Sequence, residues 1–385
     1  MGCSFSGLNA LYGAMSWGGD VWINEDRFRI LKQLGEGESA SLYIVKEIAT
    51  AAGEDDGGGG GGIAGKRRRH HHPHHTPSHV ATTIIASGDG TYAMKKILIQ
   101  SPEQLELVKE EIHVSSLFNH PNLLPLLDHS IIAVKGQQGG SWNYEAYVLF
   151  PVYLDGTMLD NAIAMHSRDE FFPTYTVLQI FRQLCSGLKH MHSFDPPYAH
   201  NDVKPGNILI THTKGQPPLA ILTDFGSARP ARKQIRSRSE ALELQARPFS
   251  LSLLVYEWAA EHCSAPFRAP ELWDCPSHAD IDERTDIWSL GCTLYTIMYG
   301  MSPFEYAIGE SGGSLQLAIS NGEIKWPVGP ETPYPDSLRL FIIWMLQPQP
   351  AMRPYIEDVI FHLDKLFAKL SNKPSHLVSS PTVPL

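Results

Sequence analysis

The sequence predicts an α+β fold in two lobes, a strand-rich part followed by a mainly helical part. Residues 28–48 contain two strand-like apolar runs around a glycine-rich turn, and residues 91–99, TYAMKKILI, have the composition of a further strand. Beyond Asp155 the apolar residues recur at helical spacing. The chain has 385 residues, of which 43% are hydrophobic and 19% charged, enough to bury a core for two lobes. We therefore expect a cleft between the lobes.

The other elements follow from local signals. Residues 101–119 open with Ser and Pro at the cap and first-turn positions of a helix. Further strands are predicted at residues 120–136 and 144–153, and further helices at residues 176–194, 284–300, 337–347 and 356–370. Residues 50–90 are of low complexity, rich in glycine and histidine, and cannot build a core. They are therefore predicted to be a disordered insertion between two strands.

Composition argues against several classes of protein. The net charge of −10 speaks against a nucleic-acid-binding protein, and no specific nucleic-acid partner is expected. The five cysteines are scattered without a CxxC pair, which indicates a reducing, cytosolic environment rather than a disulfide framework. No apolar run approaches the roughly 20 residues of a membrane-spanning helix. The N-terminus also lacks the basic-then-apolar pattern of a secretory signal.

The N-terminus instead has the pattern of an acylation site. The opening MGCSFS matches the acceptor pattern for N-myristoylation at Gly2, with Ser6 in its last position, and Cys3 can carry a palmitoyl chain. A single myristoyl chain binds a membrane only marginally, so stable attachment needs a second signal. Gly2 and Cys3 would supply both. The alternative is an unmodified terminus of small residues.

The segment LGEGESASL, residues 34–42, has the composition of a phosphate-binding turn. Glycines let a backbone turn tightly and bring its amides close to phosphate oxygens. Such turns are also common in ordinary hairpins, and Ala40 occupies the third glycine position, which should make the turn stiffer. The predicted nucleotide-binding residues here are Leu34, Gly35, Glu36, Gly37, Ala40 and Leu42.

A lysine on the next strand and a glutamate on the following helix are a second candidate for phosphate binding. Lys95, held by Glu111, would contact the α- and β-phosphates of a nucleotide. Lys96 and Glu110 are the alternatives in register, and strand alternation favours Lys95, at the end of the strand, as the inward residue. Taken alone, the two residues would favour the alternative of a surface ion pair.

Four motifs in the second half then follow in a fixed order. They are YAHNDVKPGNIL at 198–209, DFG at 224–226, RAPE at 268–271 and DIWS at 286–289. With the glycine-rich turn upstream, they resemble a eukaryotic protein kinase domain over about residues 28–370, apart from two insertions.

The resemblance implies a two-lobed protein kinase fold, in which an antiparallel sheet and one helix form the N-terminal lobe. The domain would cover residues 28–370, with lobes at about 28–153 and 154–370. An acylated segment, residues 1–27, would precede it, and a flexible tail, residues 371–385, would follow it.

The resemblance also implies the residues of an active site that uses ATP and Mg²⁺, with Mn²⁺ as an alternative metal. Asp202 corresponds to the base that accepts the proton of the substrate hydroxyl, and Lys204 neutralises charge on the transferred phosphoryl group. Asn207 and Asp224 correspond to the metal ligands. Lys95 and Glu111 complete the predicted catalytic set.

Other residues are expected to support this site. Tyr153 belongs to the hinge, residues 151–153, whose backbone would contact adenine, and Phe150 precedes it as gatekeeper. The resemblance further implies that Asp286 accepts backbone hydrogen bonds from the catalytic loop. His200 is expected to have a structural rather than a catalytic role.

Two departures from the kinase pattern bear on regulation and activity. Asn201 stands where most kinases have an arginine that binds an activation-loop phosphate, so activity is not expected to require loop phosphorylation. The second departure lies within the activation segment, where residues 246–256 match no known part. They either form a tolerated insertion or occlude the acceptor groove.

Glu271 and Arg353 are expected to form a buried ion pair that anchors the end of the activation segment.

Lys204 and Ser264 are typical of serine/threonine kinases, so the expected partners are proteins with Ser or Thr acceptors. A pseudokinase scaffold is the alternative function, although the intact predicted catalytic set argues against it. A small-molecule or lipid kinase is disfavoured by residues 268–286, which in protein kinases dock peptides. The oligomeric state is left open by the sequence.

Phrases such as LFNHPNLL and EWAAEHC, with the MGC start, resemble the Numb-associated kinase family, closest to its myristoylated and palmitoylated branch. This implies a location on the cytoplasmic face of Golgi, trans-Golgi network or plasma membranes, reached through acyl chains, and a part in secretory traffic. The basic run at residues 66–69 is expected to be a solvated loop, with lipid binding, nuclear import or metal binding as alternatives.

Overall fold

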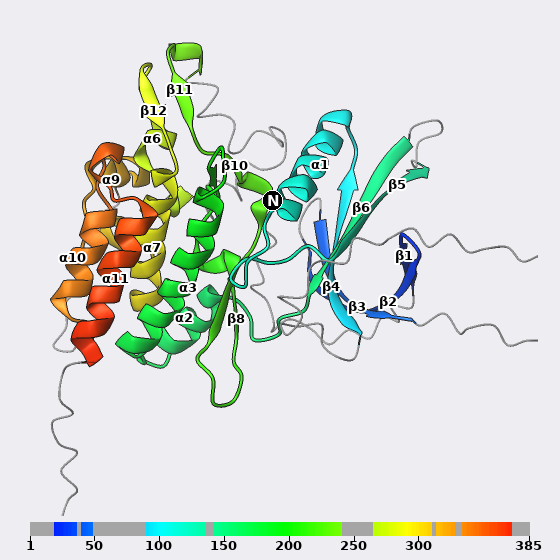
Figure 1. Cartoon of the computed structure of the whole chain (residues 1–385), viewed down its shortest axis with the longest axis horizontal. Coiled ribbons are helices and arrows are strands. Elements are labelled where there is room, and N and C mark those ends of the chain that lie inside the picture. Colours follow the sequence, from blue (N-terminus) through cyan, green and yellow to red (C-terminus); the bar gives the residue numbers. More distant parts are fainter. Residues whose placement is uncertain are drawn as a thin grey trace, which may run out of the picture.

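The computed structural model describes residues 19–36, 40–48, 90–135, 142–240, 265–309, 313–327 and 333–371 (Figure 1). They form a sheet-containing lobe and a mainly helical lobe that lie side by side. The predicted division into two lobes is therefore confirmed.

The first lobe is built on one antiparallel sheet with the strand order β1-β2-β3-β4-β6-β5. Its strands are β1 (Asp20–Ile23), β2 (Asp26–Glu36), β3 (Ala40–Glu47), β4 (Thr91–Ile99), β5 (Asp128–Lys135) and β6 (Trp142–Pro151). The helix α1 (Pro102–Leu117) lies between β4 and β5 in the chain. It begins as the sequence predicted, because the Ser101 hydroxyl accepts a hydrogen bond from the Gln104 amide (3.2 Å) and proline takes the first turn.

Both faces of the sheet are buried. On one face, Ile97 and Ile99 of β4 pack with Val108 and Ile112 of α1. On the other, Met94 belongs to a separate apolar cluster under β1 and β2. Alternating residues of β4 therefore enter two different cores, and this alternation directs Lys95 to the face that α1 covers.

The folded part begins earlier than the sequence predicted. Residues 20–23 were assigned to the acylated segment, but they form β1, and Ile23 is fully buried with Phe28. The strand is only four residues long and is joined to β2 by a tight turn in which Asn24 has a φ of 52°. The Asn24 amide also donates to Asp128 on β5 (2.8 Å) and so ties the two edges of the sheet together. So short a strand has little periodicity to detect.

The second lobe packs helices around α7. Every residue of α7 after its first is buried, which explains why its sequence is apolar on all sides. The helices are α2 (Met158–His166), α3 (Thr174–His192), α6 (Pro270–Trp273), α7 (Arg284–Tyr299), α8 (Pro303–Ile308), α9 (Leu315–Asn321), α10 (Asp336–Met345) and α11 (Ile356–Ser371). The four helices that the sequence predicted here correspond to α3, α7, α10 and α11.

Short strand pairs complete this lobe. They join β7 (Tyr198–Ala199) to β10 (Arg229–Pro230), β8 (Ile208–Thr211) to β9 (Leu219–Leu222), and β11 (Lys233–Ile235) to β12 (Ala279–Ile281). These pairs hold the loops that carry the polar motifs, and all of them are antiparallel. They therefore set the geometry of the site described below.

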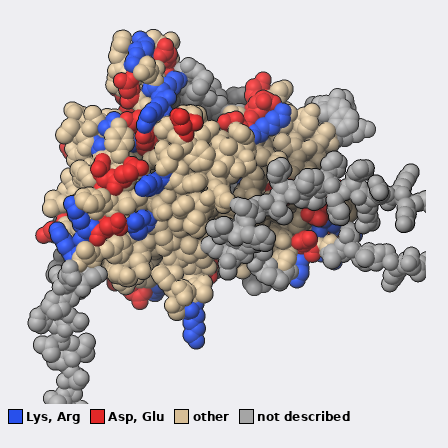
Figure 2. Space-filling model, viewed as in Figure 1, with Lys and Arg blue, Asp and Glu red and all other residues tan. Residues whose placement is uncertain are grey.

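Two surface properties of the described residues bear on partners. None of their helices combines the length and apolarity needed to cross a bilayer. On the face in Figure 2, basic and acidic side chains are interspersed over the helical lobe. Nucleic-acid-binding proteins usually present one sign of charge over a continuous surface, so this face favours other partners.

Candidate active site

A pocket that is open to solvent lies between the two lobes. Its walls come from both lobes: Leu34, Leu42, Ala93, Lys95, Glu111, Ser115, Leu124, Phe150, Pro151, Val152, Tyr153, Leu209, Thr223, Asp224 and Phe225. The predicted hinge, gatekeeper, lysine, glutamate and DFG aspartate thus all face one space.

The glycine-rich turn contributes its flanking leucines to the pocket. Leu34 and Leu42 line it, and Gly35 is paired with Leu42 across β2 and β3. Glu36 and Ala40 lie at the adjoining strand ends, outside the lining. Gly37 lies outside the described residues.

Several wall residues were not predicted. Ala93 lies two positions before Lys95 on β4, and Leu209 lies two positions after Asn207 on β8. The two-residue period of a strand could have identified both as neighbours of the predicted residues. Ser115 lies one helical turn after Glu111 on α1, and Thr223 immediately precedes Asp224, so local spacing could have identified these two as well. For Leu124 no such local signal points to the pocket.

The structure pairs Lys95 with Glu111 and Lys96 with Glu145. The Lys95 Nζ to Glu111 Oε1 distance is 2.6 Å, and both side chains are largely buried. The Lys96 ammonium lies 2.9 Å from Glu145 on the opposite face. The preferred register is confirmed. However, Lys95 lies in the middle of β4 and not at its end, because the strand continues to Ile99 under α1.

These two lysines form a matched pair for mutagenesis. We expect Lys95→Met to lower kcat/KM for ATP by roughly 10²-fold or more, because it removes a fixed positive charge from a water-poor site. Lys96→Met removes the same charge from the opposite face and should change kcat/KM by less than about twofold. Steady-state kinetics with varied ATP measure both. Equal losses in the two variants would contradict the assignment of Lys95.

A compact set of polar contacts holds the catalytic loop. Lys204 Nζ donates to Asp202 Oδ2 (2.8 Å), and Asn207 Nδ2 donates to the same oxygen and to the Asp202 carbonyl (both 2.9 Å). Next to this loop, β8 pairs with β9, and the Thr223 amide donates to the Asn207 carbonyl (2.8 Å). The β8–β9 pair therefore brings Asn207 beside Thr223, which immediately precedes Asp224.

The carboxylate of Asp224 lacks donors. Both of its oxygens are buried, and neither has a hydrogen-bond partner among the described residues. Its backbone has a φ of 67°, a strained left-handed conformation of the kind that is found at functional sites. Burial acts to raise the pKa of this carboxyl, whereas the positive charges of Lys95 and Lys204 act to lower it.

These residues fit a bound Mg²⁺. Buried carboxylate oxygens without donors are ligands that a hard cation prefers, and the Asn207 amide oxygen is a second, since its nitrogen is already used. Within the described part of the chain, no three His, Cys, Asp or Glu side chains gather to hold a metal by themselves. Mg²⁺ in phosphate-transfer sites typically takes one or two protein carboxylates and completes its shell with phosphates and water.

Asp286, near the start of α7, anchors the catalytic loop. Its fully buried carboxylate accepts hydrogen bonds from the backbone amides of His200 (2.7 Å) and Asn201 (2.8 Å) and contacts His192 Nε2 (2.9 Å). The predicted role of Asp286 is confirmed. The His200 ring lies between the Thr223 carbonyl and the Asp202 amide (3.1 and 3.2 Å). These contacts hold the ring in place and fit the structural role predicted for it.

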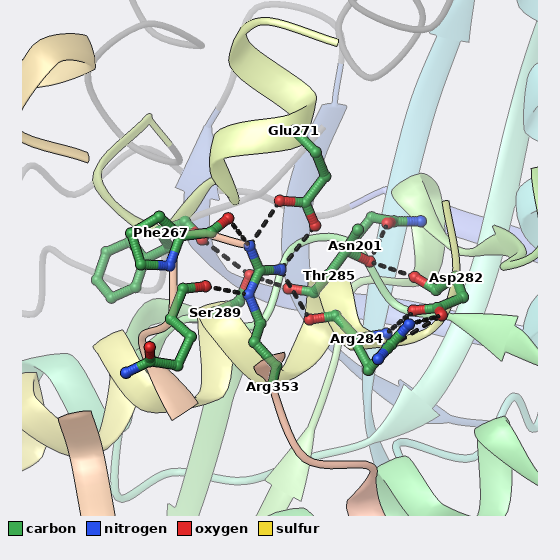
Figure 3. A network of polar contacts seen from close by, with 10 residues as sticks. Asn201, Phe267, Glu271, Asp282, Arg284, Thr285, Ser289 and Arg353 are labelled. Carbon is green, nitrogen blue, oxygen red and sulfur yellow. Dashed lines mark hydrogen bonds and ion pairs between the residues drawn. The ribbon is translucent and has the colours of Figure 1, made fainter. Parts of the chain in front are cut away.

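The predicted ion pair between Glu271 and Arg353 is confirmed. The guanidinium contacts the two carboxylate oxygens at 2.6 and 2.7 Å, and both side chains are buried (Figure 3). It also donates to the backbone carbonyls of Gln347, Pro348 and Arg284. All five of its N–H groups are therefore used.

Comparison with known proteins identifies the class. Residues 76–363 match the family model described as protein kinase domain, which covers more than half of the chain. The chain therefore belongs to the protein kinase family. The match begins inside the long insertion, so β1, β2 and β3 lie outside it, although they belong to the same sheet as β4.

Individual relatives narrow this class. The chain is 34% identical to serine/threonine-protein kinase 16 of Rattus norvegicus and to that of Homo sapiens, over 71% of this chain and 81% of each relative. It is 28% identical to serine/threonine-protein kinase ppk13 of Schizosaccharomyces pombe, over 89% of this chain and 92% of that relative. The chain is accordingly an ATP-dependent serine/threonine protein kinase.

Some predicted features lie outside the described residues. They are the acylation sites Gly2 and Cys3, the basic run at 66–69, Ser264 and the segment 246–256.

Proposed function

We propose that this kinase transfers the γ-phosphoryl group of ATP to Ser or Thr hydroxyls of proteins while attached to a membrane by N-terminal acyl chains. The observation that supports the transfer best is the buried carboxylate of Asp224, which has no hydrogen-bond partner among the described residues and lies in the pocket that Lys95 also lines. Lys95 supplies a positive charge for the phosphates of the nucleotide, and Asp224 supplies a ligand for a metal that binds the same phosphates.

The residues divide the reaction between them. Lys95 holds the α- and β-phosphates, and Glu111 keeps its ammonium directed into the pocket. Bound Mg²⁺, held by Asp224 and Asn207, would neutralise charge on the phosphates. Asp202 receives the proton of the acceptor hydroxyl.

The contacts of Asp202 suit this proton transfer. Its Oδ2 already accepts from Lys204 and Asn207, which leaves Oδ1 as the oxygen for the acceptor proton. The Lys204 ammonium, only 2.8 Å from Oδ2, stabilises negative charge close to the transferred group. Positioning and preorganised charge are the main sources of rate enhancement in phosphoryl transfer.

Incubation of the purified full chain with Mg²⁺, γ-labelled ATP and a generic protein substrate tests this reaction. Phosphoamino-acid analysis should find label on serine and threonine. Binding of ATP without any transferred label would instead support the scaffold alternative.

Acylation makes a specific prediction for membrane partition. We expect Gly2→Ala to move the protein into the soluble fraction and Cys3→Ser to weaken attachment, because stable residence needs two signals. Cell fractionation measures both, and metabolic labelling with myristate shows the chain directly. Membrane partition of Gly2→Ala equal to the natural chain would rule out this anchor.

A deletion separates the acyl chains from the basic run. Removal of residues 53–80 should leave the membrane partition unchanged if this insertion is a solvated loop.

We further propose that the chain belongs to the acylated branch of the Numb-associated kinases. We place it on the cytoplasmic face of Golgi, trans-Golgi network or plasma membranes, with a role in secretory traffic. The sequence phrases given above support this placement.

A further inference from the structure

The residue next to the proposed base has an unusual backbone and an unusual set of contacts. Asn201 has a φ of 60°, in the left-handed region that asparagine tolerates better than most residues. Its amide N–H donates to Asp286 Oδ1 (2.8 Å). The side chain therefore projects from a backbone that α7 holds in place.

The side chain of Asn201 connects three parts of the lobe. Its Nδ2 group donates to the carbonyls of Ala199 and Ser227, both at 3.3 Å. Its Oδ1 accepts from the Thr285 hydroxyl, also at 3.3 Å (Figure 3). The reverse orientation of the amide would face two carbonyl oxygens with a third oxygen, so the contacts themselves determine the orientation. We call these four residues the Asn201 bridge.

The bridge lies between the loops of the two proposed catalytic carboxylates. Ala199 precedes Asp202 by three positions, and Ser227 follows Asp224 by three positions. Between these loops, the pair β7–β10 is only two residues long, with Arg229 opposite Ala199. Before Asp224, the loops are joined by the contacts of Thr223 with Asn207 and His200. After Asp224, Asn201 adds one hydrogen bond between the loops, to the Ser227 carbonyl, while its bond to Ala199 holds its own loop.

We propose that Asn201 is a positioning residue that sets the separation between Asp202 and Asp224. The inference rests on the roles proposed above for these two aspartates. Asn201 does not line the ATP pocket, and the partners of its side chain are neutral groups of the fold. Its loss should therefore lower the rate of transfer while nucleotide binding persists.

Three substitutions separate the amide from the backbone conformation. Asn201→Gly keeps the left-handed backbone and removes the side-chain contacts. Asn201→Asp keeps the shape but places a carboxylate oxygen against the carbonyls of Ala199 and Ser227. Thr285→Val removes one hydroxyl and leaves both amide donations intact.

A positioning role for Asn201 predicts a ranking of kcat among these three variants. The loss of the three side-chain hydrogen bonds should lower kcat of Asn201→Gly by about tenfold, with Asn201→Asp lower still and Thr285→Val within about threefold of the natural chain. The KM for ATP should change by less than about threefold in all of them. Thermal unfolding and nucleotide binding of each full-length variant show whether it is folded.

Two outcomes would overturn the inference. A folded Asn201→Gly with kcat within twofold of the natural chain would show that only the backbone conformation matters. A folded Asn201→Asp more active than Asn201→Gly would show that shape, and not the donated hydrogen bonds, is required. An inactive natural chain would count against the proposed function instead, so the two failures are distinguishable.

Discussion

Replacement of Asp202 by asparagine is expected to lower kcat by roughly 10²- to 10⁴-fold, the usual contribution of a general base. The amide cannot accept the proton of the acceptor hydroxyl, although it has nearly the same shape. Because Lys95, Asp224 and the hinge are unchanged, ATP should still bind. Transfer of labelled phosphate under single-turnover conditions measures the effect.

Asp364→Asn is the matched control for this substitution. Asp364 lies on α11, far along the chain from the pocket residues, and forms an exposed ion pair with Arg182. The same chemical change there should leave kcat within about twofold. Transfer by Asp202→Asn at the rate of this control would count against Asp202 as the base.

Replacement of Arg353 by methionine is expected to destabilise the protein by about 3–5 kcal/mol, because it leaves the buried Glu271 carboxylate without its counter-charge. Arg353 is 3% exposed and Glu271 6%. Three backbone carbonyls lose a donor at the same time. Equilibrium unfolding in denaturant measures the change in free energy.

Two further variants test whether the unpaired charge of Glu271 causes the loss of stability. Arg182→Met breaks the exposed pair with Asp364 and should cost no more than about 1 kcal/mol. Adding Glu271→Gln to Arg353→Met removes the uncompensated charge and should recover part of the lost stability. If the double variant is as unstable as the sum of both single changes, packing and not charge is the cause.

The site was predictable wherever a local rule applied. Strand alternation chose Lys95 over Lys96, and the ion pairs with Glu111 and Glu145 agree with that choice. The order of the polar motifs predicted a protein kinase, and the family match agrees. Neither inference needed knowledge of distant contacts, because strand alternation is a local rule and the order of motifs is visible along the chain.

Other features were decided by distant contacts. The strand β1 is too short to carry a periodic signal, and it is stabilised by burial of Ile23 against the rest of the sheet. Leu124 lines the pocket although no predicted site residue lies near it in the chain. The Asn201 bridge likewise depends on Ser227 and Thr285, which are remote from Asn201 in the chain.

The amino-acid sequence by itself determined the class of protein, the identity of its polar motifs and the orientation of individual side chains along strands and helices. Only the tertiary structure decided where the folded part begins, what lines the pocket and how the loops of Asp202 and Asp224 are joined. The reason is physical. Periodicity and capping act within a few residues, whereas a pocket exists only when segments far apart in the chain pack together.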